Sequence, residues 1–276
     1  MSDSSFAVRN ASASAISAIA RIEIPYGMWN NIFDNFRDIV QDPNACVEYK
    51  VACVESIRYI CEDFQDVQDY QFSAEMVSSL FLLLLGCMQS NQPDPLWKEA
   101  VTALNQALSY ADDFMKDENQ CRCVMEGVFN STQHSNVEIQ ACAFECLDNL
   151  FYLFYSYIPP FFEAFYTACE KAICGSYPET AIQACLTLVT LANVEKEIEE
   201  IHQQTNELCK KCGNQLIPYL CQIMTTKDED DDSETMTLPT AAATCLRCFA
   251  EVMKDGMFIL RIDLLNRFSF NCLAFR

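Results

Sequence analysis

The chain has 276 residues, of which 51% are hydrophobic, so it is long enough and apolar enough to bury a sizeable core. Its 39 Asp and Glu outnumber 18 Lys and Arg, which gives a formal net charge of −21. A surface this negative repels phosphate groups and anionic lipid, so it argues against binding to nucleic acid or to a membrane. Only 6 glycines occur, which disfavours tight β-turns and phosphate-binding loops. Basic proteins are the partners that this charge favours.

The 17 cysteines lie inside helical patterns, and the N-terminus lacks the basic start and apolar stretch of a secretory signal. We therefore expect reduced thiols that serve as small apolar side chains in a cytosolic protein. The longest apolar run, residues 80–88, is far shorter than the roughly 20 residues that cross a bilayer.

A pattern of two small residues at i and i+4, followed by Ile or Leu, recurs along the chain. The intervals between its apolar anchors are 41, 47, 43, 39 and 60 residues, and the anchors in chain order are Ile16, Ile57, Leu104, Leu147, Leu186 and Leu246. Small residues one helical turn apart allow two helices to approach closely, as stacked helix pairs require. The pattern indicates a structural repeat of about 42 residues.

Each repeat contains two helical patterns. The anchors lie on amphipathic segments such as 137–154, whose apolar residues advance in steps of three and four. A second apolar helix is expected between anchors, for example over 74–89, 120–130 and 161–174, with helices starting near Asp94-Pro95 and Tyr177-Pro178. A period of about 42 with two helices and no strand pattern is typical of HEAT or armadillo repeats. We predict an all-α superhelix, a HEAT-type solenoid over residues 1–276.

The interval of 60 residues contains an insertion. We expect an extended helix over 193–207, crowded with glutamates, and then an acidic insertion over 225–237. Such a run repels itself, so it stays solvated unless a cation-rich partner covers it. The alternative is a solvated linker without a role. The carboxylates of the acidic run are Asp228, Glu229, Asp230, Asp231, Asp232 and Glu234.

Little in the sequence points to catalysis. It holds no Walker loop, no G-x-G-x-x-G and no H-E-x-x-H, and its two histidines are His134 and His202. Cys209 and Cys212 form a C-x-x-C for which His202 and Cys221 could supply further zinc ligands, but a second C-x-x-C is missing. We expect no metal, no cofactor and no enzymatic activity, and treat a thiol-based redox enzyme as the weaker alternative.

Aromatic residues crowd the segment 150–166. Most of these rings should lie in the core, but consecutive aromatic positions cannot all face inward. Some of Phe161, Phe162, Phe165 and Tyr166 should therefore reach a groove between outer helices and form shallow pockets suited to aromatic side chains of a peptide.

Several strings, in order along the chain, resemble one family. Residues 18–25 followed by Trp29, residues 55–63, 100–104 and 154–157, and the acidic run followed by 241–246 are together similar to the importin-β family of nuclear import receptors. Their collinearity and the acidic insertion make the resemblance specific. It covers nearly the whole chain.

The resemblance implies a transport receptor segment whose outer helices bind the phenylalanine-glycine (FG) repeats of nucleoporins. It also implies that the inner face and the acidic run bind basic partners, namely an importin-α-type adaptor or a cargo segment, and the GTPase Ran. Such a protein is expected in the cytoplasm and nucleus and at the nuclear pore. The candidate FG contacts are Val124, Val128, Phe129, Phe161, Phe162, Phe165 and Tyr166.

The sequence also departs from the family pattern. The family has a Trp shortly after the acidic run, where this chain has Met236 or Thr237. The resemblance starts near the third repeat, and the first two repeats carry much of the family's Ran contact, so we expect weak Ran binding. A HEAT-repeat scaffold without a transport role is the alternative function. An armadillo adaptor is disfavoured, because Trp29 and Trp97 alone cannot form its ladder of tryptophans.

Overall fold

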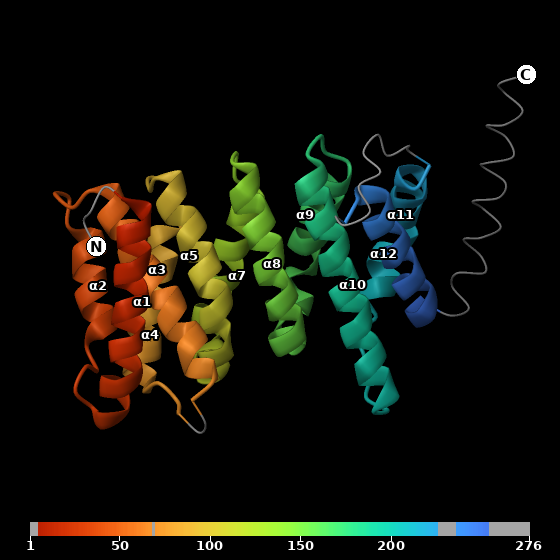
Figure 1. The fold of residues 1–276 in the computed structure, drawn as a ribbon. Helices are drawn as coiled ribbons and strands as arrows, with labels where there is room; N and C mark the ends of the chain where they lie inside the picture. Colours follow the sequence, from red (N-terminus) through yellow and green to blue (C-terminus); the bar gives the residue numbers. More distant parts are fainter. Residues whose placement is uncertain (1–4, 68–69, 226–235, 254–276) are drawn as a thin grey trace, which may run out of the picture. The chain divides into compact units, whose positions relative to one another are not determined.

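The computed structural model describes residues 5–67, 70–225 and 236–253 (Figure 1). Over these ranges the chain forms twelve α-helices and four short 3₁₀ helices, and no β-strand. The predicted all-α fold is confirmed. No described helix is both long enough and apolar enough to cross a membrane.

The chain divides into two compact units, Met1–Asn149 and Leu150–Arg276. Unit 1 contains α1 (Phe6–Glu23), α2 (Ile32–Gln41), α3 (Val47–Gln65), α4 (Ala74–Cys87), α5 (Asp94–Ala107), α6 (Asp112–Met115) and α7 (Glu118–Thr132). The boundary falls within α8 (Val137–Phe154), and unit 2 contains α9 (Phe162–Ile173), α10 (Pro178–Glu200), α11 (Leu208–Ile223) and α12 (Leu238–Met253). The 3₁₀ helices are η1 (Ile24–Tyr26), η2 (Leu108–Tyr110), η3 (Tyr155–Tyr157) and η4 (Pro159–Phe161).

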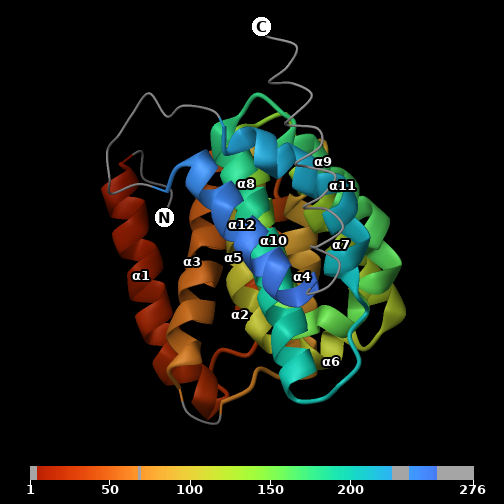
Figure 2. The same cartoon turned by 90° about the vertical axis from the view of Figure 1, so that its right-hand side faces the viewer.

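Unit 1 consists of two layers of helices. In one layer α1 packs on α3 and α3 packs on α5, and in the other α2 packs on α4 and α4 packs on α7. Figure 2 shows α1, α3 and α5 on one side of the unit and α4 and α7 on the other. Consecutive repeats thus contribute one helix to each layer, as the paired pattern in the sequence predicts.

Side-chain hydrogen bonds join equivalent helices of successive repeats. The Ser17 hydroxyl of α1 donates to Asp63 of α3 at 2.5 Å, and the Arg58 guanidinium of α3 donates to Glu99 of α5 at 3.0 Å. The partners are 46 and 41 residues apart, close to the repeat length read from the sequence. The period therefore corresponds to physical contacts between neighbouring repeats.

The six anchors lie on six different helices, α1, α3, α5, α8, α10 and α12. Ile57, Leu104 and Leu147 are fully buried, and Ile16, Leu186 and Leu246 are half-buried.

Unit 2 repeats the arrangement. α10 packs on α12 and α9 packs on α11, while α9 also contacts α10 and α11 contacts α12. The predicted helix over 193–207 is wrong in both limits: α10 runs from Pro178 without a break and ends at Glu200. Its last turn holds acidic residues and no basic one, which opposes the negative C-terminal end of the helix dipole. His202 and Glu207 then adopt left-handed backbone conformations, with φ of 57° and 53°, which turn the chain into α11.

Candidate partner-binding groove

The run of leucines in α4 leaves apolar side chains on both sides of the helix. Leu80, Phe81 and Leu84 are fully buried in the core of unit 1. Leu82 is 61% exposed and Leu85 is half-buried, on the side away from that core. A helix with apolar residues on all sides is usually buried by neighbouring elements on every side, but the side of α4 that carries Leu82 is only partly buried.

The neighbouring helix α7 approaches this open side of α4 closely. The carboxylate of Asp117 starts α7 by accepting hydrogen bonds from the backbone N–H groups of Asn119 and Gln120, at 3.0 and 2.9 Å. Further along α7, a Cβ added to Gly127 would lie 3.0 Å from Leu85 Cδ2 and 3.3 Å from the methyl carbon of Met88. The absence of a side chain at Gly127 therefore lets the two helices come together.

Between α4 and α7 lies a groove of about 460 Å³, which we call the apolar groove. Its lining combines apolar residues of α4 with the polar side of α7, and includes Phe114 of α6. The lining residues are Ser78, Leu82, Leu85, Gly86, Met88, Gln89, Phe114, Asn119, Gln120, Cys123, Glu126, Gly127 and Asn130. A shallow apolar groove with a polar margin suits one side chain of an extended peptide.

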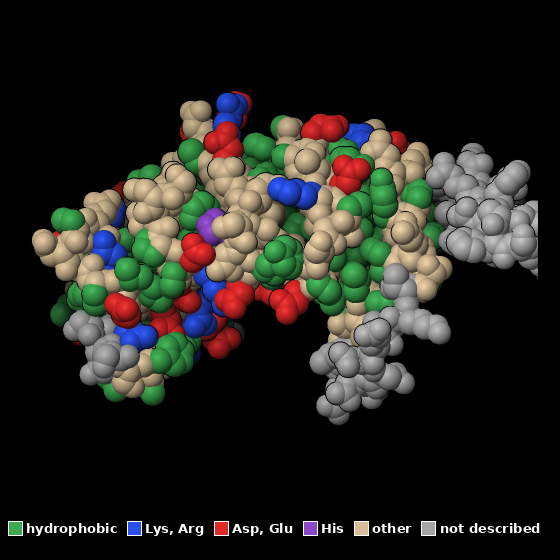
Figure 3. Space-filling model, turned by 90° about the horizontal axis from the view of Figure 1, so that it is seen from above, with side chains coloured by type: hydrophobic (Ala, Val, Ile, Leu, Met, Phe, Trp, Pro, Cys, Tyr) green, Lys and Arg blue, Asp and Glu red, His purple; other side chains and the backbone are tan. Residues whose placement is uncertain are grey.

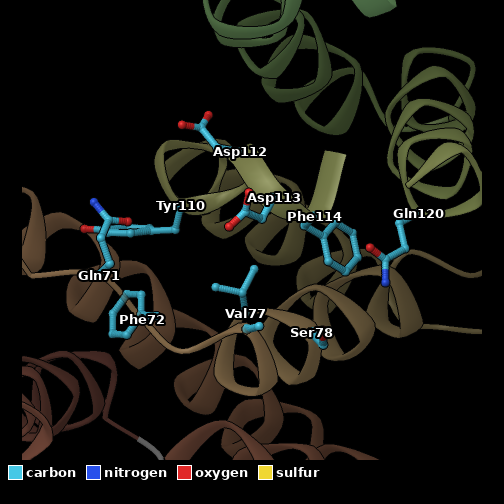
Figure 4. A pocket seen from close by; sticks show the side chains of 10 residues that line it. Gln71, Phe72, Val77, Ser78, Tyr110, Asp112, Asp113, Phe114 and Gln120 are labelled. Carbon is cyan, nitrogen blue, oxygen red and sulfur yellow. The ribbon is translucent and has the colours of Figure 1, made fainter. Parts of the chain in front are cut away.

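A second pocket of about 360 Å³ adjoins the groove, and we call it the acidic pocket (Figure 4). Figure 4 shows Val77 of α4 across from Asp113 of α6, with Tyr110 and Phe114 to either side. Asp113 accepts a hydrogen bond from Lys116 at 2.6 Å, which lowers the pKa of the Asp113 carboxyl. Asp113 is therefore ionised at neutral pH.

The acidic pocket has a rigid aromatic wall. The Tyr110 hydroxyl donates to the carbonyl of Cys61 at 2.9 Å, and burial raises the pKa of Tyr110. Phe72 packs against Tyr110 with ring centroids 4.7 Å apart, and against Phe33 and Phe64 on its other sides. The wall is therefore held in place by its own packing.

The predicted FG-contact residues of α7 do not line this groove. Val124 and Val128 are fully buried and Phe129 is 9% exposed, because they lie on the face of α7 that packs into unit 1. Cys123 and Glu126, on the opposite face of the same helix, line the groove instead. Val124, Val128 and Phe129 therefore expose little or no surface to a partner, and whether α7 binds FG segments stays a prediction.

The predicted contacts in unit 2 are also largely covered. Phe165 is fully buried against Phe151, with ring centroids 4.7 Å apart. Phe161, Phe162 and Tyr166 are half-buried. The Lys211 ammonium lies 5.9 Å above the Phe162 ring, and the Tyr166 hydroxyl donates to Glu170 at 3.0 Å.

The acidic run from Asp228 to Glu234 lies outside the described residues, and so does most of the 225–237 insertion. Met236, where the family pattern expects a Trp nearby, is 47% exposed. Thr237 follows it just before α12, where its hydroxyl accepts from the backbone N–H of Thr240 at 3.4 Å.

The helices α3 and α5 carry charged groups that are paired with one another. Arg58 bonds Glu62 at 3.0 Å and Glu99 at 3.0 Å, and its guanidinium lies 4.3 Å from the centre of the Tyr59 ring. These contacts outweigh burial and raise the pKa of Arg58. Figure 3 shows acidic and basic side chains beside one another with hydrophobic ones among them.

The C-x-x-C cysteines are core residues of α11. Cys209 and Cys212 are fully buried, and burial with the nearby Glu195 carboxylate raises the pKa of the Cys212 thiol to about 12. A thiol with so high a pKa is a poor nucleophile and a poor metal ligand at neutral pH. Among the residues that the structure describes, no three His, Cys, Asp or Glu side chains are placed to hold a metal ion.

Comparisons with known proteins agree with the repeat architecture. No family model matches the chain. Importin subunit beta-1 of Schizosaccharomyces pombe is 24% identical over 257 residues, and that of Saccharomyces cerevisiae is 25% identical over 256 residues. Each match covers 88% of this chain but 29% of the relative, so the chain spans less than a third of the length of these proteins.

Solved structures show the same likeness. The Kap95:Nup1 complex matches with a TM-score of 0.79 and 25% identity, over 87% of this chain and 29% of that chain. The structure of yeast importin-β (Kap95p) matches with a TM-score of 0.80 and 24% identity, over the same shares. A designed armadillo repeat protein matches less well, with a TM-score of 0.56 and 14% identity over 90% of this chain. Over most of its length the chain is therefore similar to importin-β, in sequence and in its helical-repeat fold.

Proposed function

We propose that this chain is a segment of a nuclear transport receptor and that it binds FG segments of nucleoporins in the apolar groove between α4 and α7. The observation that carries the proposal is the groove itself, an exposed apolar site on a fold shared with Kap95. Kap95, 25% identical over the matched part, is the protein of the solved Kap95:Nup1 complex. The proposed role is binding, without catalysis.

The chemistry of the groove suits a phenylalanine beside a glycine. A Phe side chain buries about 150–250 Å², which corresponds to a gross gain of about 4–6 kcal/mol at roughly 25 cal/mol per Å². Ordering a peptide and losing its free motion offset much of that gain, so we expect micromolar or weaker affinity for one motif. The neighbouring glycine lets the peptide backbone lie close to the groove margin.

The groove contains its own reporter for a test. Cys123 lines the groove and is exposed, while Cys46 and Cys174 are exposed elsewhere. A Phe-Gly peptide at saturating concentration should slow the alkylation of Cys123 by N-ethylmaleimide and leave the other two rates unchanged. A Ser-Gly peptide is the matched control. Equal rates at all three cysteines with and without the Phe-Gly peptide would refute binding in the groove.

A substitution separates the groove from general surface effects. Leu82→Ser removes an exposed apolar side chain from the groove, and Ile22→Ser removes one of similar exposure, 66%, from α1. Only Leu82→Ser should weaken Phe-Gly binding and restore the alkylation of Cys123. If both variants bind as the unchanged chain does, the peptide site lies elsewhere.

We further propose that the acidic run binds basic partners, an importin-α-type adaptor or cargo segment and, weakly, Ran. Support comes from the density of carboxylates between Asp228 and Glu234 and from the likeness to Kap95p, which was solved with RanGDP. Replacing Asp228, Asp230 and Asp232 by Asn should weaken the binding of a basic adaptor peptide and flatten its salt dependence. Unchanged affinity would exclude this role. The proposed location is the cytoplasm, the nucleus and the nuclear pore.

A further inference from the structure

The apolar groove and the acidic pocket form one continuous surface along α4. They share the lining residues Ser78, Phe114 and Gln120, so the two pockets adjoin and neighbouring residues of one peptide could occupy both. The ends of this surface differ in chemistry. Leu82 and Leu85 stand at one end, and Asp112 and Asp113 stand at the other.

The acidic end carries net negative charge. Asp112 and Asp113 form the first turn of α6, and both are exposed. Lys116 pairs with Asp113, so one ammonium group faces two carboxylates. Among the described residues that line the two pockets none is Lys or Arg, and Glu126 lies on the α7 side of the apolar groove. A cationic side chain is the natural complement of this end.

The pocket below the carboxylates would also accept the stem of such a side chain. Phe72 and Tyr110 form an aromatic wall, and Gln71 and Gln120 offer amide oxygens at the margin. Lys and Arg pack their aliphatic stems along apolar surface while the charged end stays near carboxylates and water. An Arg can also place its guanidinium beside an aromatic ring.

We propose that this surface binds a peptide through two side chains, an aromatic one in the apolar groove and a nearby Lys or Arg in the acidic pocket. The proposal rests on the proposed function and names the class of nucleoporin segment that the groove prefers: FG motifs flanked by basic residues, in preference to motifs flanked by acidic ones. Asp112 and Asp113 are the residues that set this preference.

The test compares three peptides that contain one Phe-Gly motif with Lys, Ser or Glu placed three residues away on both sides. Their affinities are measured for the unchanged chain, for Asp112→Asn/Asp113→Asn, and for Glu197→Gln/Glu200→Gln. The last variant loses the same two charges from exposed positions of α10 and controls for net charge. Exposed ion pairs contribute little, so the Lys peptide should bind about two- to fivefold more tightly than the Ser peptide at low salt. The Glu peptide should bind more weakly than the Ser peptide.

The outcomes separate the two proposals. A preference for Lys that vanishes in Asp112→Asn/Asp113→Asn and in 0.5 M salt, but persists in the α10 control, supports the acidic pocket as its source. Binding of the Ser peptide with no gain from Lys overturns this inference and leaves the proposed function standing. A Lys preference that survives in Asp112→Asn/Asp113→Asn also overturns it. Failure of all three peptides to bind or to protect Cys123 removes the proposed function and this inference with it.

Discussion

Glu195 is a buried carboxylate near the end of α10 that accepts hydrogen bonds from the start of α11. Its removal tests whether these hydrogen bonds stabilise unit 2. Its side chain has no exposed surface. One oxygen accepts from the Tyr155 hydroxyl at 2.5 Å and from the backbone N–H of Leu208 at 2.6 Å, and the other accepts from the backbone N–H of Cys209 at 3.1 Å. The carboxylate thus satisfies the first N–H groups of α11, which have no partner within the helix.

The change Glu195→Ala leaves three buried donors without an acceptor. A hydrogen bond to a charged group contributes about 1.5–3 kcal/mol, and an unsatisfied buried donor costs about 1–3 kcal/mol. Water that enters the vacated space recovers part of this loss, and the unchanged chain bears the cost of burying the charge. We therefore expect the free energy of unfolding of unit 2 to fall by about 3–5 kcal/mol. Glu195→Gln keeps one acceptor oxygen and should cost about 1–2 kcal/mol.

The readout must be local, because a chain with two compact units need not unfold in one step. Hydrogen exchange of the segment 201–212 should speed up strongly in Glu195→Ala, while exchange in α3 and α5 stays unchanged. Glu200→Gln, a change of an exposed carboxylate on the same helix, is the matched control and should leave exchange unaltered. If Glu195→Ala exchanges at the same rate as the control, the carboxylate does not hold α11 and the reasoning from hydrogen bonds is refuted.

Three further predictions concern thiols and charge. At pH 7.5 the exposed Cys123 should be alkylated within minutes, and the buried Cys53 only after unfolding, because burial raises the pKa of the Cys53 thiol to about 12. Mass spectrometry of native and urea-unfolded samples measures both rates. Burial raises the pKa of Cys53 and Cys87 to about 12 in the folded chain, whereas an unfolded thiol ionises above about pH 8.5. The contribution of these thiols to stability is therefore complete below about pH 8.5 and is lost as the pH rises toward 12. The free energy of unfolding should therefore fall by about 2 kcal/mol per such thiol by pH 10 under reducing conditions, and a urea midpoint that is flat between pH 8 and 10 would contradict it. Arg58→Met should destabilise unit 1 by about 2–3 kcal/mol, since it leaves Glu99 without its cation, and Arg58→Lys should restore part of that loss in urea unfolding.

The repeat was predictable from sequence because it depends on local rules. Small residues one turn apart fix which face of each helix approaches its neighbour, so the spacing of Ile57, Leu104 and Leu147 reveals where the buried contacts recur. The start of α5 at Asp94 and of α10 at Pro178 follow from the same kind of signal, a proline in the first turn.

The groove was not predictable in the same way, because exposure depends on the neighbour. The apolar run over 80–88 was evident, but the sequence does not say that α7 leaves Leu82 uncovered. The helical spacing of α7 does contain a signal for the groove. Cys121, Val124 and Val128 share the buried face, so Cys123 and Glu126 lie on the opposite face. The apolar residues of α7 that the sequence analysis proposed as FG contacts lie on its buried face, because apolar character marks the face that packs into the core.

The same consideration explains why an apolar groove persists on α4. A helix in a stacked array has neighbours in its own layer and in the other layer, so its outward face needs no apolar residues for folding. Leu82, exposed on that face, adds nothing to the core and carries the usual cost of apolar surface in water. Gly127 keeps the facing helix close against Leu85 while Leu82 stays exposed, and Asp112 and Asp113 add charge to the adjoining pocket. These features together favour a surface used for binding over one left apolar by chance, and replacing Leu82 by Ser should leave stability within about 0.5 kcal/mol while it weakens the peptide complex.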